Sequence, residues 1–372
     1  MKPTLHYPFI AACAGLAFFG VTMFAIGPIL SQLGEGANAL PATLSIGIIL
    51  GTVIFGPVVD RSGYKWMLVA GALLALSGIQ GLAHFRRMDM LHLSMIALGT
   101  GGGILNGATN ALVSSLYDDA QRGMKLSILG AFYCIGALLW TLLNYFSPTD
   151  YTFPLNSISA VMALFILFFT LVRFPAPKPQ GRVSLKAYLN LLKYPSLWLF
   201  ALILFFQSGF EGVSGNFTAK FLENEHGLAK EAATLSLTWF TVGMLFGRFF
   251  LGYLMKKAGD SMTLYAYLTI AIAGVSLLYF TADIIIVYLA MSLIGLGVGA
   301  TYPVIFNYLG RIFKQMSGTV FSIAIFIALW GQFVFNKIVG LLFDKNLFEY
   351  FPAALILAAF MMMILLPVAK KK

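Results

Sequence analysis

A short polar stretch, Gly56-Pro57-Val58-Val59-Asp60-Arg61-Ser62-Gly63-Tyr64-Lys65, ends one apolar run of this chain, and a similar stretch, Gly252-Tyr253-Leu254-Met255-Lys256-Lys257-Ala258-Gly259, ends another 196 residues further on. Three glycines and one basic residue coincide at this single offset: Gly51 with Gly247, Gly56 with Gly252, Gly63 with Gly259, and Arg61 with Lys257. Because the matches fall at the same junction between an apolar run and a polar loop, they indicate an internal repeat. Internal repeats are typical of secondary transporters.

The apolar runs are long enough to cross a membrane, which takes about 20 residues each. Of the 372 residues, 59% are hydrophobic and 10% are charged, with a mean hydropathy of +0.87, whereas soluble domains carry about 25% charged residues. This composition excludes a soluble enzyme, a disordered chain and a nucleic-acid-binding module, and the lack of period-two alternation excludes an outer-membrane barrel. The predicted spans are 8–33, 39–59, 65–85, 90–116, 124–147, 152–174, 196–222, 231–255, 262–282, 284–310, 316–343 and 347–368.

Basic residues are distributed unevenly over the loops. With the N-terminus in the cytoplasm, 18 of the 24 Lys and Arg fall on the cytoplasmic side, Arg248 among them, 5 fall outside, and Lys337 lies within a span. By the positive-inside rule this bias places both termini in the cytoplasm. The net charge of +10 is therefore topological, and the short loops favour a bacterial inner membrane.

One long polar connection divides the spans into two groups of six. It covers 175–195, is basic, and carries an amphipathic pattern that favours a helix on the membrane surface. The predicted domains are an N-terminal six-helix bundle at 1–174, this cytoplasmic linker, and a C-terminal six-helix bundle at 196–372. The predicted fold class is an all-α polytopic membrane protein with twelve transmembrane helices in two pseudo-symmetric bundles.

The pattern Gly56-x-x-x-Asp60-Arg61-x-Gly63-x-Lys65 resembles the loop 2–3 motif of the major facilitator superfamily, and 252–259 resembles its loop 8–9 counterpart. Span number, orientation, linker and repeat extend the resemblance over the whole chain. Tyr64 departs from the motif at a basic position, and Lys256 stands at the acidic position of the second copy. The resemblance implies a cytoplasmic gate formed by Gly56, Asp60, Arg61, Gly63, Lys65 and Lys257. The alternative is that these charges are only topological anchors.

Three Gly-rich stretches, 99–111, 209–217 and 295–303, resemble the fucose–galactose–glucose symporter branch of this superfamily. The first span holds no carboxylate and Asn106 stands where the branch has an acid, so the N-terminal half lacks the proton-carrying acids of that branch. The chain also lacks the span 4 arginine of proton-coupled drug exporters. Lys337 is the only candidate for the embedded cation that an anion carrier needs, which favours a neutral, hydroxyl-rich solute.

Only one of the 14 acidic residues, Glu211, is predicted to lie deep in a span, where an ionisable group costs about 2.5–3.5 kcal/mol. Polar pairs at i, i+4 spacing share one helix face, and amides both donate and accept hydrogen bonds, as sugar hydroxyls require. An aromatic ring can stack on the C–H face of a sugar. The predicted substrate-binding residues are Asn106, Asn110, Gln207, Glu211, Tyr302, Trp330, Gln332 and Asn336, and Glu211 is also the candidate for proton coupling.

Each of these residues has a structural alternative. Amides in membrane helices often hold neighbouring helices together, Trp330 can be a packing aromatic, and Tyr302 can be shaped by the kink at Pro303. Lys337 either snorkels to the membrane surface or pairs with Glu211, which would make Glu211 a structural bridge.

We expect a secondary active transporter that moves a monosaccharide or a similar polyol by alternating access. The coupling ion is H⁺ through Glu211, with Na⁺ symport or uniport as alternatives. The second hypothesis is an exporter of drug-like or other small amphiphilic molecules, which the 34 Phe and 16 Met would suit. A different class of protein would be a non-transporting membrane sensor or an intramembrane enzyme. An intramembrane protease needs an embedded Ser/His, Asp/Asp or metal constellation, whereas the predicted spans hold one deep carboxylate.

No cofactor or metal is expected, because Cys13 and Cys134 have no His or acidic cluster nearby and no nucleotide-binding G-x-x-x-x-G-K-[ST] motif is present. The expected partners are the small-molecule solute, H⁺ or Na⁺, and the lipid bilayer. No nucleic acid is expected, and members of the resembled superfamily are usually monomers.

Overall fold

The computed structural model describes residues 6–371 apart from 118, 148, 176–190 and 314–316. At 56, 57, 60–62, 119, 120, 122, 123, 127, 317–319 and 371 it describes the backbone but not the side chain. The described part is built from helices joined by short loops and contains no strand. The chain divides into two compact units, Met1–Gln180 and Gly181–Lys372.

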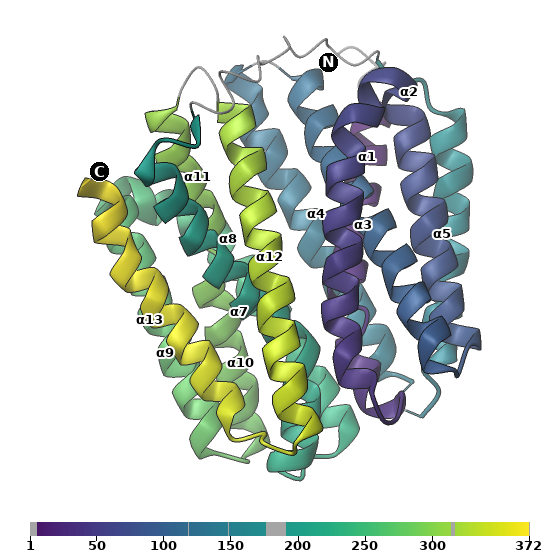
Figure 1. Cartoon of the computed structure of the whole chain (residues 1–372), viewed down its shortest axis with the longest axis vertical. Helices are drawn as coiled ribbons and strands as arrows, with labels where there is room; N and C mark the ends of the chain where they lie inside the picture. The colour runs from purple at the N-terminus through teal and green to yellow at the C-terminus, as the bar shows by residue number, and fades with distance from the viewer. Residues whose placement is uncertain (1–5, 118, 148, 176–190, 314–316, 372) are drawn as a thin grey trace. The chain divides into compact units, whose positions relative to one another are not determined.

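The N-terminal unit is a bundle of long α-helices with two short 3-10 segments after the first (Figure 1). Its elements are α1 (His6–Phe24), η2 (Gly27–Gln32), η3 (Ala37–Ala39), α2 (Leu40–His84), α3 (Met88–Leu116), α4 (Asp119–Tyr145) and α5 (Thr152–Leu171). Two candidate membrane spans, Ala37–Phe55 and Gly63–His84, lie along η3 and α2, and the second begins at Gly63, where the backbone of α2 is not helical.

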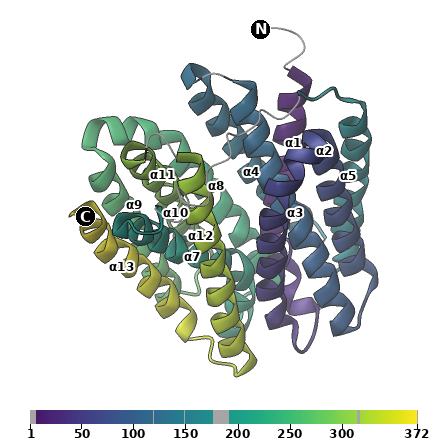
Figure 2. The same cartoon turned by 45° about the horizontal axis from the view of Figure 1, so that its top comes forward.

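The C-terminal unit repeats this plan, and one of its six spans is divided into two helices (Figure 2). Its elements are α7 (Pro195–Glu225), α8 (Lys230–Ala258), α9 (Asp260–Phe280), α10 (Ile284–Val298), α11 (Thr301–Ile312), α12 (Ser317–Asp344) and α13 (Tyr350–Lys371). Helix α12 packs along α7, and α10 packs along α8 and α9.

The described residues contain twelve helical segments long and apolar enough to cross a membrane, each in a region where a span was predicted. The twelve-helix prediction is therefore confirmed. Two predicted spans differ in detail. The one at 8–33 is α-helical only to Phe24, because a 3-10 segment with proline in its first turn starts at Gly27. The one at 284–310 is split into α10 and α11.

Glycines mark the points where the helices cross, because an added Cβ would overlap a carbonyl of the neighbouring helix. These contacts are Gly51 with Thr100 and Gly99 with Leu44 in the N-terminal unit, and Gly247 with Leu296 and Gly295 with Phe240 in the C-terminal unit. Both the glycine and its partner recur at the same offset of 196 residues. The second and fourth spans therefore cross as the eighth and tenth do, which confirms the internal repeat.

The two turns that first indicated the repeat also have the same backbone conformation. Gly63 has φ 75° and ψ 169°, and Gly259 has φ 79° and ψ 160°. Side chains other than glycine strongly disfavour this region, although the space around both glycines is open. The predicted tight turn at Gly63 is confirmed.

The predicted gate and linker stay predictions. The side chains of Gly56, Asp60 and Arg61 lie outside the described part, as do residues 176–190 of the linker. Lys65 is half-buried, and Lys257 is exposed with its ammonium 5.9 Å from the ring centre of Tyr253.

Candidate functional site

The middle of α7 is buried on every side, although it is polar. All residues from 207 to 219 are buried, and they include Gln207 at 0% exposure and Glu211 at 7%. Buried polar groups need partners to offset the loss of water, so the residues that face this segment define the candidate site.

One face of α7 is joined by hydrogen bonds to the broken tenth span. The amide Nε2 of Gln207 donates to the carbonyl oxygen of Val298 at 3.0 Å. The hydroxyls of Ser208 and Tyr302 form a hydrogen bond of 2.7 Å. Both contacts lie at the junction of α10 and α11, so two predicted site residues, Gln207 and Tyr302, come together here, with Glu211 one turn further along α7.

The junction itself interrupts the backbone hydrogen-bond ladder. Helix α10 closes with a bond of 3.1 Å from the N–H of Gly299 to Leu296, and α11 opens with one of 3.1 Å from the N–H of Val304 to Ala300. Pro303 has no N–H to donate to Gly299, four residues earlier, so one bond of a continuous helix is missing at this break. In membrane proteins a discontinuous helix is tolerated where it is buried in protein or lines a cavity.

Three buried oxygens on α7 and α11 accept no hydrogen bond from any described residue. They are Oε1 of Gln207, Oγ of Ser214 and Oγ1 of Thr301. Such groups are costly unless a donor reaches them. The oxygens of Gln207 and Ser214 on α7 and of Thr301 on α11 are therefore acceptors that a hydroxyl group or a water molecule can satisfy.

The predicted pair on α12 faces a different side of α7. A Cβ at Gly212 would lie 2.8 Å from Cγ of Gln332 and 3.2 Å from Nδ2 of Asn336. Asn336 also accepts a hydrogen bond of 3.2 Å from Nδ2 of Asn216. Gln332 and Asn336 share one face as predicted, and their contacts are those of residues that hold α7 and α12 together.

Trp330 does not share that face. Two residues before Gln332, it lies about 200° around the helix, and it is 43% exposed, with edge contacts to Phe326 and Phe333. The structure therefore separates Trp330 from the amides with which it was grouped.

In the N-terminal unit, Asn106 and Asn110 contact each other on α3. The Nδ2 of Asn110 donates to the carbonyl of Asn106 at 2.9 Å and to its Oδ1 at 3.0 Å. Asn106 occupies the position that corresponds, at the 196-residue offset, to Tyr302. The repeat thus places two predicted site residues at equivalent points of their own units.

Sequence reasoning missed Arg248. It was counted with the cytoplasmic charges, but it lies ten residues before the end of α8 at Ala258, about 15 Å into the helix. Its backbone N is 3.5 Å from where a Cβ of Gly299 would stand, and its Nε is shielded from solvent. The overlooked signal is its place directly after the crossing glycine, Gly247.

Lys337, by contrast, is exposed, which fits the expectation of a side chain that extends toward the surface. The alternative of a Lys337–Glu211 bridge stays a prediction.

The C-terminal unit has a second cluster of polar residues where α9 begins, at Asp260. Asp260 accepts hydrogen bonds from Arg311 and from Nδ2 of Asn307, both at 2.9 Å, and Nζ of Lys370 donates to Ser261 at 2.8 Å. Asp260, Ser261, Arg311 and Lys370 border a pocket of about 420 Å³. They tie α9, α11 and α13 together at their ends.

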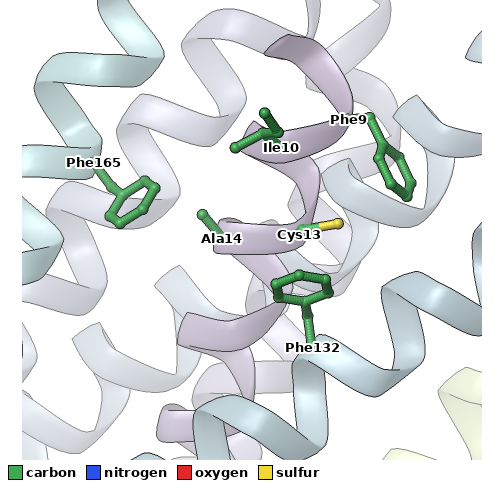
Figure 3. A pocket seen from close by; sticks show the side chains of 6 residues that line it. All are labelled: Phe9, Ile10, Cys13, Ala14, Phe132 and Phe165. Carbon is green, nitrogen blue, oxygen red and sulfur yellow. The ribbon is translucent and has the colours of Figure 1, made fainter. Parts of the chain in front are cut away.

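The N-terminal unit has an apolar pocket of about 170 Å³ between α1, α4 and α5 (Figure 3). Cys13 lies there with Phe132 and Phe165, which suits its predicted role as a packing residue. Among the described residues, no three His, Cys, Asp or Glu gather as a metal site would require.

A buried acid beside a broken helix, in a protein of twelve spans built from two repeats, defines a multi-pass membrane transporter. Residues 9–336 match the Major Facilitator Superfamily, and the chain belongs to this family.

Comparison with known proteins agrees. The chain is 24% identical over 334 residues to a chloramphenicol resistance protein of Pseudomonas aeruginosa, which covers 85% of this chain and 78% of that protein. It is similar in structure to the nucleoside transporter NupG, with a TM-score of 0.81 at 12% identity, covering 97% of this chain and 99% of the other. A D-xylose-proton symporter gives a TM-score of 0.77 at 18% identity and 99% coverage of both chains. At these identities the two solved structures show the fold alone, and both are structures of transporters.

Proposed function

We propose that this protein is a secondary active transporter that moves a small neutral polar solute, a monosaccharide, by alternating access across a bacterial inner membrane, with both termini in the cytoplasm. The observation that carries the proposal is the buried polar face of α7 opposite the junction of α10 and α11, where Gln207 and Ser208 reach Val298 and Tyr302. In this proposal the protein acts as a monomer, and its partners are the solute, a coupling ion and the bilayer.

The chemistry of this face suits hydroxyl groups. The acceptor oxygens of Gln207, Ser214 and Thr301 receive no hydrogen bond from the described residues, and a sugar hydroxyl both donates and accepts. A polar solute that fills these positions recovers hydrogen bonds that the empty site lacks, which is how a site built for hydroxyls rejects analogues without them. The similarity to a D-xylose-proton symporter supports the same solute class.

Proton coupling is assigned to Glu211. It is the acid that the structure buries in the middle of a span, and its carboxylate belongs to the same face of α7 as Gln207. An ionisable group in this position is costly and is a functional candidate by default. Symport requires that proton and solute bind together, and a shared helix face provides for that.

The test is uptake of labelled monosaccharides into proteoliposomes, with and without an inward proton gradient. We expect the gradient to stimulate uptake in the native protein, and Glu211→Gln to abolish the stimulation. Glu225→Gln is the matched control, because Glu225 is exposed at the end of the same helix. If the proton gradient does not change the rate of uptake, proton coupling is refuted and the assignment of a sugar as the solute stands. No uptake of any sugar by folded protein would refute the solute class.

The second candidate is an exporter of drug-like amphiphiles. The similarity to a chloramphenicol resistance protein over 85% of this chain favours it. Expression in a drug-sensitive host distinguishes the two, because an exporter raises the inhibitory concentration of chloramphenicol, whereas a sugar transporter leaves it unchanged.

A further inference from the structure

The ends of α8, α9, α11 and α13 border the pocket of about 420 Å³ in the C-terminal unit. Its volume lies in the range of about 300–1,000 Å³ that is typical of small-molecule sites. Three charged residues line the pocket, Asp260, Arg311 and Lys370, so the lining carries one net positive charge. Lys256 and Lys257 lie exposed in the last turn of α8, beside the pocket. The pocket is therefore electropositive.

Arg311 keeps hydrogen-bond donors for a ligand although it is paired with an acid. Its Nη1 donates to Asp260 at 2.9 Å, which uses one of the five N–H donors of a guanidinium. The side chain of Asp260 is 7% exposed, whereas that of Arg311 is 63% exposed. The buried carboxylate thus anchors a guanidinium that remains accessible at the pocket. The fork of a guanidinium matches the geometry of phosphate oxygens.

Lys370 brings a second positive charge, which is held by a hydroxyl rather than by an acid. Its Nζ donates to Oγ of Ser261 at 2.8 Å, and the hydroxyls of Ser261 and Tyr308 form a hydrogen bond of 2.6 Å. The ring of Tyr308 is stacked on Phe200 of α7, which holds the two hydroxyls in place. The ion pairs among the described residues do not include Lys370. Its charge is therefore available to an anion.

The N-terminal unit joins the equivalent helix ends without charge. At the 196-residue offset, Asp260 corresponds to Tyr64 and Asn307 to Ala111. Asn307 donates to Asp260 at 2.9 Å, and the hydroxyl of Tyr64 donates to the carbonyl oxygen of Ala111 at 3.4 Å. Because an uncharged contact joins the same two helices, the charges of the C-terminal cluster are not needed to hold the helix ends together.

Both cations of the pocket are particular to the C-terminal unit. At the same offset, Arg311 corresponds to Ser115 and Lys370 to Phe174. In the predicted topology these helix ends face the cytoplasm, where the head groups of the inner leaflet lie. Basic pockets between membrane helices on this side suit the head groups of anionic lipids. Met262, which is 65% exposed, adds an apolar wall to the same pocket.

We propose that this pocket is a binding site for a phosphate-bearing anion, which the guanidinium of Arg311 and the ammonium of Lys370 hold. Two sources share this chemistry, the head group of an anionic phospholipid and free phosphate. The apolar wall at Met262 favours the lipid, because a phospholipid presents hydrocarbon next to its phosphate. The site goes beyond the proposed transport and holds whichever solute the protein carries.

The test titrates the purified full chain in detergent with phosphatidylglycerol and counts the bound lipid by native mass spectrometry. Lys370→Gln should weaken binding about fivefold, which is the effect of one cation near a lipid phosphate. Arg311→Gln should weaken it about tenfold or more, because a charge-assisted hydrogen bond is lost. Phosphatidylcholine with the same acyl chains should bind more weakly to the native protein and should not distinguish the variants.

Controls separate the site from general effects of charge and folding. Arg173→Gln removes an exposed cation just after the end of α5 in the other unit and should leave binding unchanged. Lys370→Gln leaves the Asp260–Arg311 ion pair in place, and Lys370→Arg should retain native binding.

Competition with inorganic phosphate distinguishes the two sources. Displacement of the lipid at a similar concentration would identify free phosphate as the ligand, and no displacement would identify the lipid head group; either result supports the site. The site is refuted if Lys370→Gln and Arg311→Gln bind phosphatidylglycerol as the native protein does, or if Arg173→Gln weakens binding as much as they do.

Discussion

The two units share their helix crossings but not their interiors. In the N-terminal unit the buried polar residues of the described part are uncharged and mostly small, such as Thr22 and Ser45, which donate to carbonyls of their own helices. The C-terminal unit buries Glu211 together with several amides. Its tenth span is broken where the equivalent span, α3, is continuous.

This difference separates two kinds of sequence information. The crossing glycines recur in register because a carbonyl occupies the space of a side chain in both units. The positions beside them have diverged: Thr52 corresponds to Arg248, Asn106 to Tyr302, and Gly107 to Pro303. The repeat therefore determines the scaffold, and the asymmetry locates the candidate site in one unit.

The largest effect is expected at the crossings. Gly295→Leu places a side chain in the Phe240 carbonyl, and Gly99→Leu places one in the equivalent Leu44 carbonyl. Overpacking costs about 3 kcal/mol or more when backbones must separate, so both variants should lose folded yield in detergent, measured by size-exclusion chromatography. Gly252→Leu is the control, because its surroundings are open. Tolerance of one variant alone would show that the crossings are not equivalent.

The second largest effect is expected at the two glycine turns. Gly63→Ala and Gly259→Ala each force a Cβ into a backbone region that costs about 1–3 kcal/mol, since φ is 75° and 79°. The losses should be equal within error, because the open surroundings add no clash. Thermal unfolding of the two variants measures this, and a large inequality would break the correspondence between the turns.

The proline at the break should give a smaller effect of opposite sign. Pro303→Ala restores an N–H that can bond to Gly299 and should stabilise the protein by about 1 kcal/mol, while slowing uptake severalfold. Pro352→Ala is the control, because Pro352 lies in the first turn of α13, where an N–H has no helical partner. If Pro303→Ala changes neither stability nor uptake, the proline does not set the difference between α3 and the tenth span.

The smallest expected effect compares the hydrogen bonds made at two equivalent positions, Tyr302 and Asn106. Tyr302→Phe removes the bond to Ser208 and should cost about 1 kcal/mol. Asn110→Ala removes exposed contacts to Asn106 and should cost about 0.2–0.5 kcal/mol. Denaturant titration in detergent distinguishes the two, and equal losses would contradict the assignment of the polar interior to the C-terminal unit.

The spans and the repeat could be predicted from sequence, because hydropathy over about 20 residues and glycine spacing are local properties. The i, i+4 pairs were also correct as helix faces. Their neighbours were not predictable: whether Gln332 faces a solute or α7 depends on which helix packs against it, and periodicity carries no such information. Trp330 was chosen as an aromatic ring that can stack on a sugar, and it lies on another face of α12 from the amides.

Arg248 was missed for a different reason, and the kink expected at Pro303 was not recognised as a division of the span into two helices. A basic residue near the cytoplasmic end of a helix satisfies the positive-inside rule. Arg248 was therefore counted as a loop charge, although it lies ten residues before the end of α8. The Gly-rich segment before Pro303 was recognised, but apolar length alone made it one helix. Both features are exceptions to the rules that identified the spans.

Helix α11 has 12 residues, a length of about 18 Å, and it is held at both ends. Tyr302 fastens one end to α7, and Arg311 and Asn307 fasten the other to Asp260 at the start of α9. It therefore behaves as a strut between two helices. A solute that replaces the Ser208–Tyr302 hydrogen bond would let α11 tilt. This tilt would stretch the Asp260–Arg311 ion pair at the other end of the helix.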